Sequence, residues 1–149
     1  MGTLTGLLGK RAYLDANVFI YAANGFAPFR RALKDIFNAV DDDKMTAITS
    51  ELTVAEILVT PFRNADARQE TECRRIVAPR PGFSLIEIKA DILERAARLR
   101  AAHRTLRLPD AIHVATAIGC KCDLVLTNDP HLKVAPAMPV MLLAEMDLS

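Results

Sequence analysis

The stretch RAYLDANVFIY, from Arg11 to Tyr21, guides the interpretation of the whole chain. An apolar run typical of a buried β-strand stops at Asp15, a short polar link follows, and an apolar helix-like run begins at Val18. A carboxylate is therefore expected at the carboxyl end of a central strand, where open α/β sheets bind ligands. Asp15 and Asn17 are also residue types that cap helices, because a short side-chain oxygen accepts from free backbone N–H groups. Both interpretations stay open here.

Length and composition predict one globular domain over residues 1–149. About half of the chain is hydrophobic (51%) and a quarter is charged (25%). The three cysteines lack the spacing of a zinc or redox motif, so free thiols in a reducing compartment are expected. We find neither a signal-peptide pattern nor an apolar run of the roughly 20 residues that span a bilayer. These features predict a cytoplasmic protein without a membrane partner.

The basic residues are unevenly distributed, although the net charge is only +1. One arginine-rich segment contains Arg63, Arg68, Arg74, Arg75 and Arg80, and a second contains Arg95, Arg98, Arg100, Arg104 and Arg107. Because the planar guanidinium suits phosphate better than an ammonium group does, these segments favour contact with a nucleic-acid backbone. The alternative is that they form solvated helix faces with Glu–Arg pairs.

Strand patterns alternate with helix patterns along the chain. We predict strands that end at Asp15 and that cover 45–49, 83–88, 123–127 and 140–143. We predict helices over 18–21, 29–41, 51–60, with Ser50 as cap and Pro61 as the stop, 64–77, 91–103 and 110–119. Such alternation implies parallel pairing through right-handed crossovers. The predicted fold class is α/β, a three-layer α/β/α sandwich with a mostly parallel sheet of four or five strands.

Four acidic residues do not fit a simple solvated surface. Glu56 lies within an apolar helix run, so its carboxylate needs a cation or hydrogen bonds unless it reaches the edge and pairs with an arginine. Asp110 lies in the first turn of a predicted helix, where the exposed N–H groups also favour an acid. Asp129 follows a strand in a turn sequence, and the crossover rules can place it beside Asp15. The four can converge on one crevice.

A cluster of four carboxylates is a poor structural device, because the charges repel one another and raise each other's pKa. A bound hard cation would offset this repulsion between the carboxylates. Ligands that are all oxygen favour Mg²⁺ or Mn²⁺ over Zn²⁺. Such ions orient and deprotonate a water for attack on phosphorus. The residues therefore predict metal-dependent hydrolysis of a phosphodiester.

Four stretches of the chain resemble the PIN-domain ribonucleases, and especially the toxins of VapBC-type toxin–antitoxin pairs. They are YLDANVFIY at 13–21, TSELTVAEIL at 49–58, LRLPDAIHVATA at 106–117 and LVLTND at 124–129. They occur in the family's order and spacing over nearly the whole chain. The resemblance implies the α/β/α sandwich already predicted and a Mg²⁺- or Mn²⁺-dependent endoribonuclease whose products carry 5′-phosphate and 3′-hydroxyl ends.

The resemblance assigns roles to individual positions. The family's metal-binding and catalytic acids fall on Asp15, Glu56, Asp110 and Asp129. Asn17 and Thr127 match small polar residues that support the site. Val114 stands where some members have a further acid, which puts a second metal in doubt. The arginines taken as candidate RNA contacts are Arg63, Arg68, Arg98 and Arg104.

The partners implied by the resemblance are an RNA substrate, an antitoxin whose tail covers the active site, and a second copy of the chain in a homodimer. His113, one turn after Asp110, is interpreted as a packed or hydrogen-bonded helix residue rather than a ligand, because His is uncommon in Mg²⁺ sites. The main alternative function is a PIN-fold module that binds RNA or a protein without cleaving. A structure-specific DNA nuclease would share the metal chemistry, but the chain leaves little room for DNA-holding segments.

Overall fold

Strand β1, which contains the first half of the opening motif, is the central strand of a parallel sheet. The computed structural model describes residues 4–134 and 138–146. The sheet has five strands in the order β3-β2-β1-β4-β5, and every neighbouring pair is parallel. The strands are β1 (Arg11–Leu14), β2 (Thr46–Ser50), β3 (Phe83–Ile86), β4 (Leu124–Thr127) and β5 (Val140–Leu142). This confirms the predicted parallel sheet.

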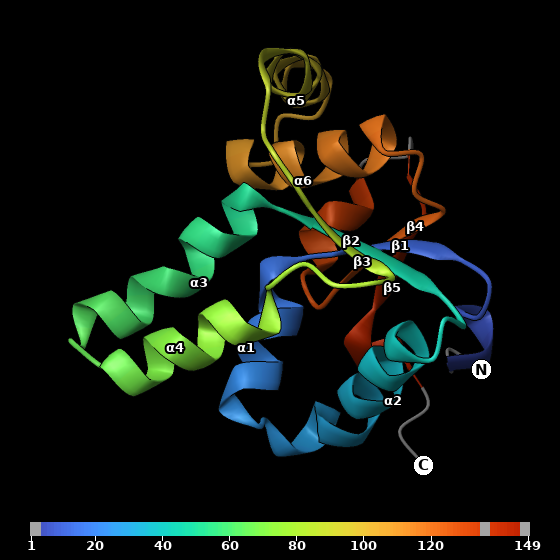
Figure 1. Ribbon diagram of the computed structural model, residues 1–149. Coiled ribbons are helices and arrows are strands. Elements are labelled where there is room, and N and C mark those ends of the chain that lie inside the picture. Colours follow the sequence, from blue (N-terminus) through green and yellow to red (C-terminus); the bar gives the residue numbers. More distant parts are fainter. Residues whose placement is uncertain (1–3, 135–137, 147–149) are drawn as a thin grey trace.

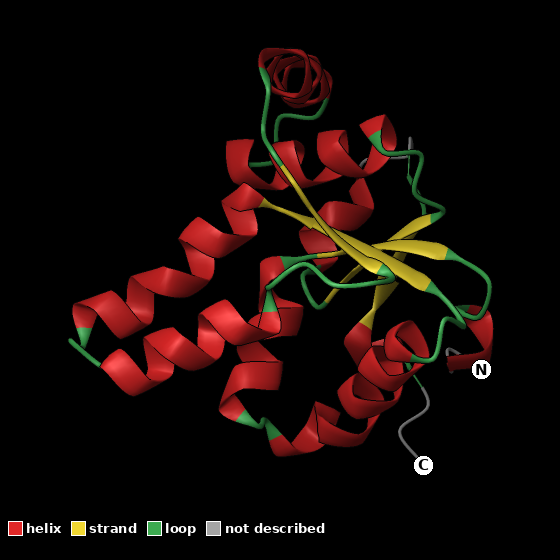
Figure 2. Cartoon of the chain, viewed as in Figure 1, coloured by secondary structure: helices red, strands yellow, loops and turns green. Residues whose placement is uncertain are grey.

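Helices cover both faces of the sheet, so the fold has three layers (Figure 1). They are α1 (Ala16–Asn24), α2 (Arg30–Asp41), α3 (Glu51–Arg63), α4 (Ala67–Ile76), α5 (Ala90–Ala102) and α6 (Leu108–Gly119). Helices α1 to α4 share one apolar core with the sheet, whereas α5 and α6 share the other. In Figure 2 the strands lie between these two groups of helices, and α3 and α4 extend outward as a pair.

The alternation of side chains in the strands explains the two cores. Leu14 and Leu126 face the core on the side of α1 to α4, whereas Tyr13 and Val125 face α6. Successive side chains of a strand point to opposite faces, and a central parallel strand is buried on both. This is why RAYL and LVLT read as continuous apolar runs.

Two predicted helix boundaries are wrong for identifiable reasons. Helix α1 begins at Ala16 rather than Val18, because the Asp15 side chain accepts a hydrogen bond from the Ala16 N–H and so caps the helix. Helix α3 continues through Pro61 to Arg63. A proline removes the bond to the carbonyl four residues earlier, and here that carbonyl, of Ile57, accepts from the thiol of Cys73 on α4.

Smaller differences affect other predicted elements. Ser50 precedes α3 but makes no side-chain capping bond, because its hydroxyl is engaged with Tyr13. The strand predicted over 83–88 ends at Ile86, and the arginine-rich helix begins only at Ala67, where Asp66 caps it. In the described part of the chain, no helix is both long and apolar enough to cross a membrane.

Candidate functional site

The site lies at the carboxyl ends of β1 and β4, which are neighbours in the sheet. Leu14 pairs with Leu126, and the Asp15 N–H donates to the Leu126 carbonyl over 3.0 Å. The connections leave β1 toward β2 on one side and reach β4 on the other, so this edge is a topological switch point. The fold therefore places Asp15 and Asp129 at the same edge of the sheet, as the sequence pattern predicts.

Asp15 is buried and held by three donors, with only 6% of its surface exposed. Its Oδ1 accepts from the Ala16 N–H at 2.8 Å. Its Oδ2 accepts from the Thr127 hydroxyl at 2.7 Å and from the Asn17 amide at 3.2 Å. Asp15 therefore caps α1 through Oδ1, and the same oxygen lies 3.3 Å from His113 Nε2, so the capping and functional interpretations are compatible.

Asn17 and Thr127 tie the loop after β4 to the start of α1. Asn17 Oδ1 accepts from the Asn128 N–H at 3.1 Å, and its amide also donates to Thr127 Oγ1. Thr127 Oγ1 in turn accepts from the Asp129 N–H at 3.1 Å. These are the two residues predicted to support the site, and both contact Asp15.

Asp129 is partly buried and has two basic neighbours. Its Oδ1 accepts from the backbone N–H of His131 at 2.9 Å and lies 2.8 Å from His131 Nδ1, and its Oδ2 lies 3.6 Å from Arg107. Burial acts to raise the pKa of Asp129, but the His131 contacts and the Arg107 charge outweigh it, so this pKa is lowered. Asp129 is therefore held as a carboxylate.

Asp110 is buried in the first turn of α6, and Arg107 Nε donates to it over 3.1 Å. Burial raises the pKa of Asp110, Arg107 opposes this effect, and the charges of Asp129 and Asp15 add to it. The Arg107 side chain, 73% exposed, thus links two of the proposed acids. Sequence reasoning gave Arg107 no place in the site, although its position one turn before Asp110 is the signal that could have identified it.

Glu56 projects from α3 toward α6 with 37% of its side chain exposed. The expected burial among apolar neighbours is only partly correct, because Ala55 and Val59 beside it are exposed. Glu56 Oε1 lies 2.5 Å from His113 Nε2. Among the residues that the structure describes, no arginine pairs with Glu56. A histidine supplies the partner that this carboxylate needs.

His113 is buried at the centre of this arrangement, and sequence reasoning did not assign it to the site. Its Nε2 lies 3.3 Å from Asp15 Oδ1 as well as close to Glu56. Ligand atoms of Asp15, Glu56 and His113 all lie within 4.8 Å of one another. Burial acts to lower the pKa of His113, but the hydrogen bond with Glu56 and the nearby carboxylates outweigh it, so this pKa is raised. Its spacing one turn after Asp110 is the sequence signal that could have assigned His113 to the site.

Among the described residues, Asp15, Glu56 and His113 offer ligand atoms close enough together to share one metal ion, and Arg107 joins Asp110 and Asp129. Buried Asp15 and Asp110 and partly exposed Glu56 and Asp129 supply carboxylate oxygens, and the two basic side chains between them, Arg107 and His113, partly balance their charge. Oxygen ligands of this kind suit Mg²⁺ or Mn²⁺.

The four arginines predicted to contact RNA are all exposed. Arg63 and Arg68 lie at the outer end of the α3–α4 pair, Arg98 lies on α5, and Arg104 lies between α5 and α6. In the described part of the chain none of them forms an ion pair with the four acids, and Arg98 pairs with Glu94. Contact with RNA therefore stays a prediction for all four.

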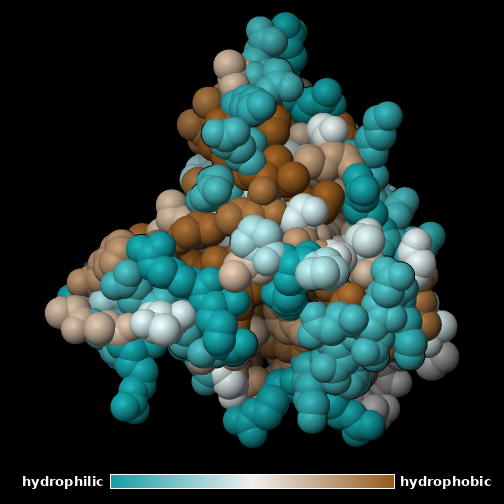
Figure 3. All heavy atoms as spheres, viewed as in Figure 1, coloured by the Kyte–Doolittle hydropathy of each residue, from teal (hydrophilic) through white to brown (hydrophobic). Residues whose placement is uncertain are grey.

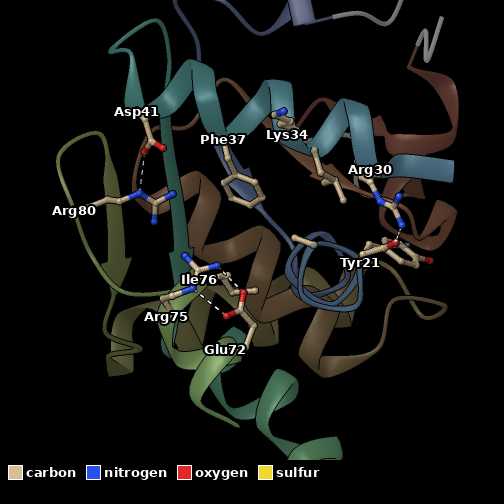
Figure 4. A pocket seen from close by; sticks show the side chains of 12 residues that line it. Tyr21, Arg30, Lys34, Phe37, Asp41, Glu72, Arg75, Ile76 and Arg80 are labelled. Atoms are coloured by element: carbon tan, nitrogen blue, oxygen red, sulfur yellow. Dashed lines mark hydrogen bonds and ion pairs between the residues drawn. The ribbon is translucent and has the colours of Figure 1, made fainter. Parts of the chain in front are cut away.

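A separate cavity of about 660 Å³ lies between α1, α2 and α4 (Figure 4). Its floor includes Phe37 and Ile76, and charged side chains form its rim. Figure 4 shows Arg80 paired with Asp41 and Arg75 paired with Glu72. None of the four proposed acids lines this cavity. The four acids at the sheet edge therefore lie apart from this cavity.

Comparison with known proteins gives a family and a set of similar structures. The family profile described as PIN domain matches residues 12–137. A toxin–antitoxin complex from Klebsiella pneumoniae is 28% identical, covers 87% of this chain and 95% of that one, and has a TM-score of 0.64. No significant match is found among curated proteins.

Two further structures share the fold at lower identity. VapBC2 from Rickettsia felis, bound to a DNA fragment of its promoter, is 16% identical, covers 89% of this chain and 98% of that one, and has a TM-score of 0.71. A sarcin-ricin loop cleaving VapC toxin of Mycobacterium tuberculosis is 15% identical, covers 83% and 94% respectively, and has a TM-score of 0.67. With the profile match over most of its length, the chain belongs to the PIN-domain family.

Proposed function

We propose that this protein is a Mg²⁺- or Mn²⁺-dependent endoribonuclease and the toxin of a VapBC-type toxin–antitoxin pair. The observation that carries the proposal is the convergence of Asp15, Glu56, Asp110 and Asp129 around Arg107 and His113 at the switch point of the sheet. The proteins with similar structures include toxin–antitoxin complexes and one toxin that cleaves the sarcin-ricin loop. Both observations favour hydrolysis of RNA over other reactions.

The metal would be held by Asp15, Asp110 and Asp129, directly or through water. When bound, such an ion stabilises negative charge on the phosphate oxygens and lowers the pKa of a coordinated water. Glu56 keeps one oxygen on His113, and we assign the other to accept the proton of the attacking water. Hydrolysis then forms a bond from the water oxygen to phosphorus and breaks the bond to the 3′ oxygen, which takes up a proton from solvent water. The products carry 5′-phosphate and 3′-hydroxyl ends.

Arg107 is suited to hold the substrate backbone. Its guanidinium is mostly exposed while it faces Asp110 and Asp129, so it can contact a phosphate that enters the crevice. Arg63, Arg68, Arg98 and Arg104 are proposed to contact more distant phosphates along the same RNA. The site-supporting roles of Asn17 and Thr127 are to keep Asp15 oriented.

The proposed partners are an antitoxin that covers the active site and a second copy of the chain. Figure 3 shows hydrophobic side chains gathered between α5 and α6 and over the first turns of α3. Exposed apolar residues of these helices include Val59, Phe62, Leu93 and Leu108. Exposed apolar side chains on these helices support helix-to-helix contact in a homodimer. We propose that the protein acts in the cytoplasm, where its RNA substrate is present.

Purified protein, free of any partner, would be incubated with a mixed RNA pool in Mn²⁺, in Mg²⁺ and in EDTA. Asp15→Asn should lower the rate by about 100-fold or more, because a carboxylate that stabilises transition-state charge is lost. Asp91→Asn, an exposed acid on α5, is the matched control and should cleave like the wild type. If folded wild type binds Mn²⁺ and leaves every RNA intact, the protein is a binding module of the same fold.

A further inference from the structure

A buried chain of hydrogen bonds runs from the sheet into the active site. Ser50 Oγ lies 2.8 Å from the Tyr13 hydroxyl, and this hydroxyl lies 2.6 Å from His113 Nδ1. His113 Nε2 then reaches Glu56 Oε1. Tyr13, Ser50 and His113 are each at most 1% exposed, so water cannot readily replace any of these contacts. The reaction proposed above uses none of these three groups directly.

The direction of the last bond in this chain follows from the chemistry of its partners. Ionised carboxylates only accept hydrogen bonds, so His113 Nε2 carries a proton where it meets Glu56 and Asp15. In the neutral imidazole, Nδ1 accepts from the Tyr13 hydroxyl; in the imidazolium, Nδ1 donates to it. The Nε2–H group therefore donates to Glu56 in either charge state, with Asp15 Oδ1 3.3 Å away.

The same histidine connects three separate parts of the fold. Glu56 belongs to α3, Asp15 ends β1, and His113 lies on α6 with Asp110 one turn before it. Glu56 is the most exposed of the four acids and is carried by a helix that extends away from the sheet. Without the Nε2–H bond, nothing else in the hydrogen bonds of the described residues fixes its carboxylate.

We propose that His113 is a positioning residue of the active site: its Nε2–H aims the Glu56 carboxylate at the metal and the attacking water beside Asp15, and Tyr13 and Ser50 align its ring. The inference rests on the proposed function. It assigns His113 the role of an outer partner of the metal-binding acids, of the kind whose loss weakens metal affinity or activity by about 10- to 100-fold.

The test compares two amides at one position. In His113→Gln the side-chain NH₂ reaches about as far as Nε2, whereas in His113→Asn it reaches only as far as Nδ1. We expect His113→Asn to weaken Mn²⁺ binding, measured by electron paramagnetic resonance on folded protein, by about 10- to 100-fold. We expect kcat to fall by a similar factor with KM for RNA unchanged, and His113→Gln to stay close to the wild type. Equal loss in both variants would indicate a packing role only and overturn the proposal.

Two further measurements keep the proposal testable if the variants unfold. Glu56→Ala changes a partly exposed residue, and it should shift the His113 Nε2–H resonance of the metal-free protein upfield; an unchanged resonance overturns the contact. Mn²⁺ bound to wild type should show no ¹⁴N coupling from His113, since such coupling would make this residue a ligand.

Failure of the proposed function and failure of this inference give different results. A wild type that neither binds Mn²⁺ nor cleaves RNA overturns the proposed function. A wild type that does both, with a His113→Asn variant that is equally active, overturns only the inference.

Discussion

Asp15 illustrates how one side chain serves both folding and chemistry. It caps α1 through Oδ1, while Oδ2 receives the Thr127 hydroxyl and the Asn17 amide. A carboxylate held by several donors keeps its direction before any ion arrives. The hydrogen-bond donors around Asp15 therefore set the orientation of its carboxylate relative to the other three acids.

Thr127→Val tests this at a single hydroxyl. Valine nearly matches threonine in shape but leaves Asp15 without a 2.7 Å donor and the Asp129 N–H without its acceptor. We expect RNA cleavage and Mn²⁺ affinity to fall by about 10- to 100-fold. Thr127→Ser restores the hydroxyl and should recover most of both. Comparable losses in Val and Ser variants would mean that the methyl group, and not the hydroxyl, is what the site requires.

Cys122 determines part of the pH dependence of stability. Burial raises the pKa of its thiol from 9.0 to about 12. Above pH 9 the unfolded chain therefore loses this proton while the folded chain keeps it, so stability falls as pH rises through this range. We expect the urea midpoint of the wild type to drop more between pH 8 and pH 10 than that of Cys122→Ala. Parallel pH profiles would exclude this thiol as the cause.

Among the elements, helix α3 shows how tertiary contact overrides a local rule. Pro61 predicts a stop, yet the helix continues for two residues, and the Ile57 carbonyl that proline leaves free meets the Cys73 thiol of α4. The same contact holds α4 against α3. The two helices thus form a pair whose base carries Glu56 and whose outer end carries Arg63 and Arg68.

Gly82, in the turn before β3, packs closely against the end of α2. Its φ is +83°, and an added Cβ would lie 2.9 Å from the carbonyl oxygen of Val40 at the end of α2. Gly82→Ala should therefore lower the free energy of unfolding by about 2 kcal/mol or more. Gly9→Ala is the matched control, because Gly9 has a similar φ of +76° and open space around it; about 1 kcal/mol is expected there. Denaturant unfolding measures both, and equal losses would show that steric overlap adds nothing.

In the whole molecule, the strand order and the two helical layers assemble the site together. Asp15 and Asp129 come from adjacent strands, Glu56 comes from the layer on one face, and Asp110 and His113 come from α6 on the other. The crevice is therefore made by the arrangement of layers, and no single element contains it. A partner that covers this edge would block all four acids at once.

The proposed homodimer can be tested by placing a charge on an exposed apolar residue of α3. Phe62 is 56% exposed near the end of α3, so Phe62→Glu should convert a dimer to a monomer in sedimentation experiments while leaving the melting temperature of the fold nearly unchanged. Leu8→Glu, an exposed apolar residue before β1, should leave the dimer intact. A dimer that tolerates both changes is formed through another face.

The local sequence determined the strands and the helices and indicated four acids as site candidates, because apolar periodicity, caps and strand ends are properties of neighbouring residues. It did not reveal Arg107 and His113 as members of the site, since their roles depend on how α6 lies across the ends of β1 and β4. It also misplaced the end of α3, where a residue of α4 accommodates the proline. Only the tertiary structure decides which basic group meets which carboxylate, because such contacts join residues as far apart as Asp15 and His113 through the packing of separate layers.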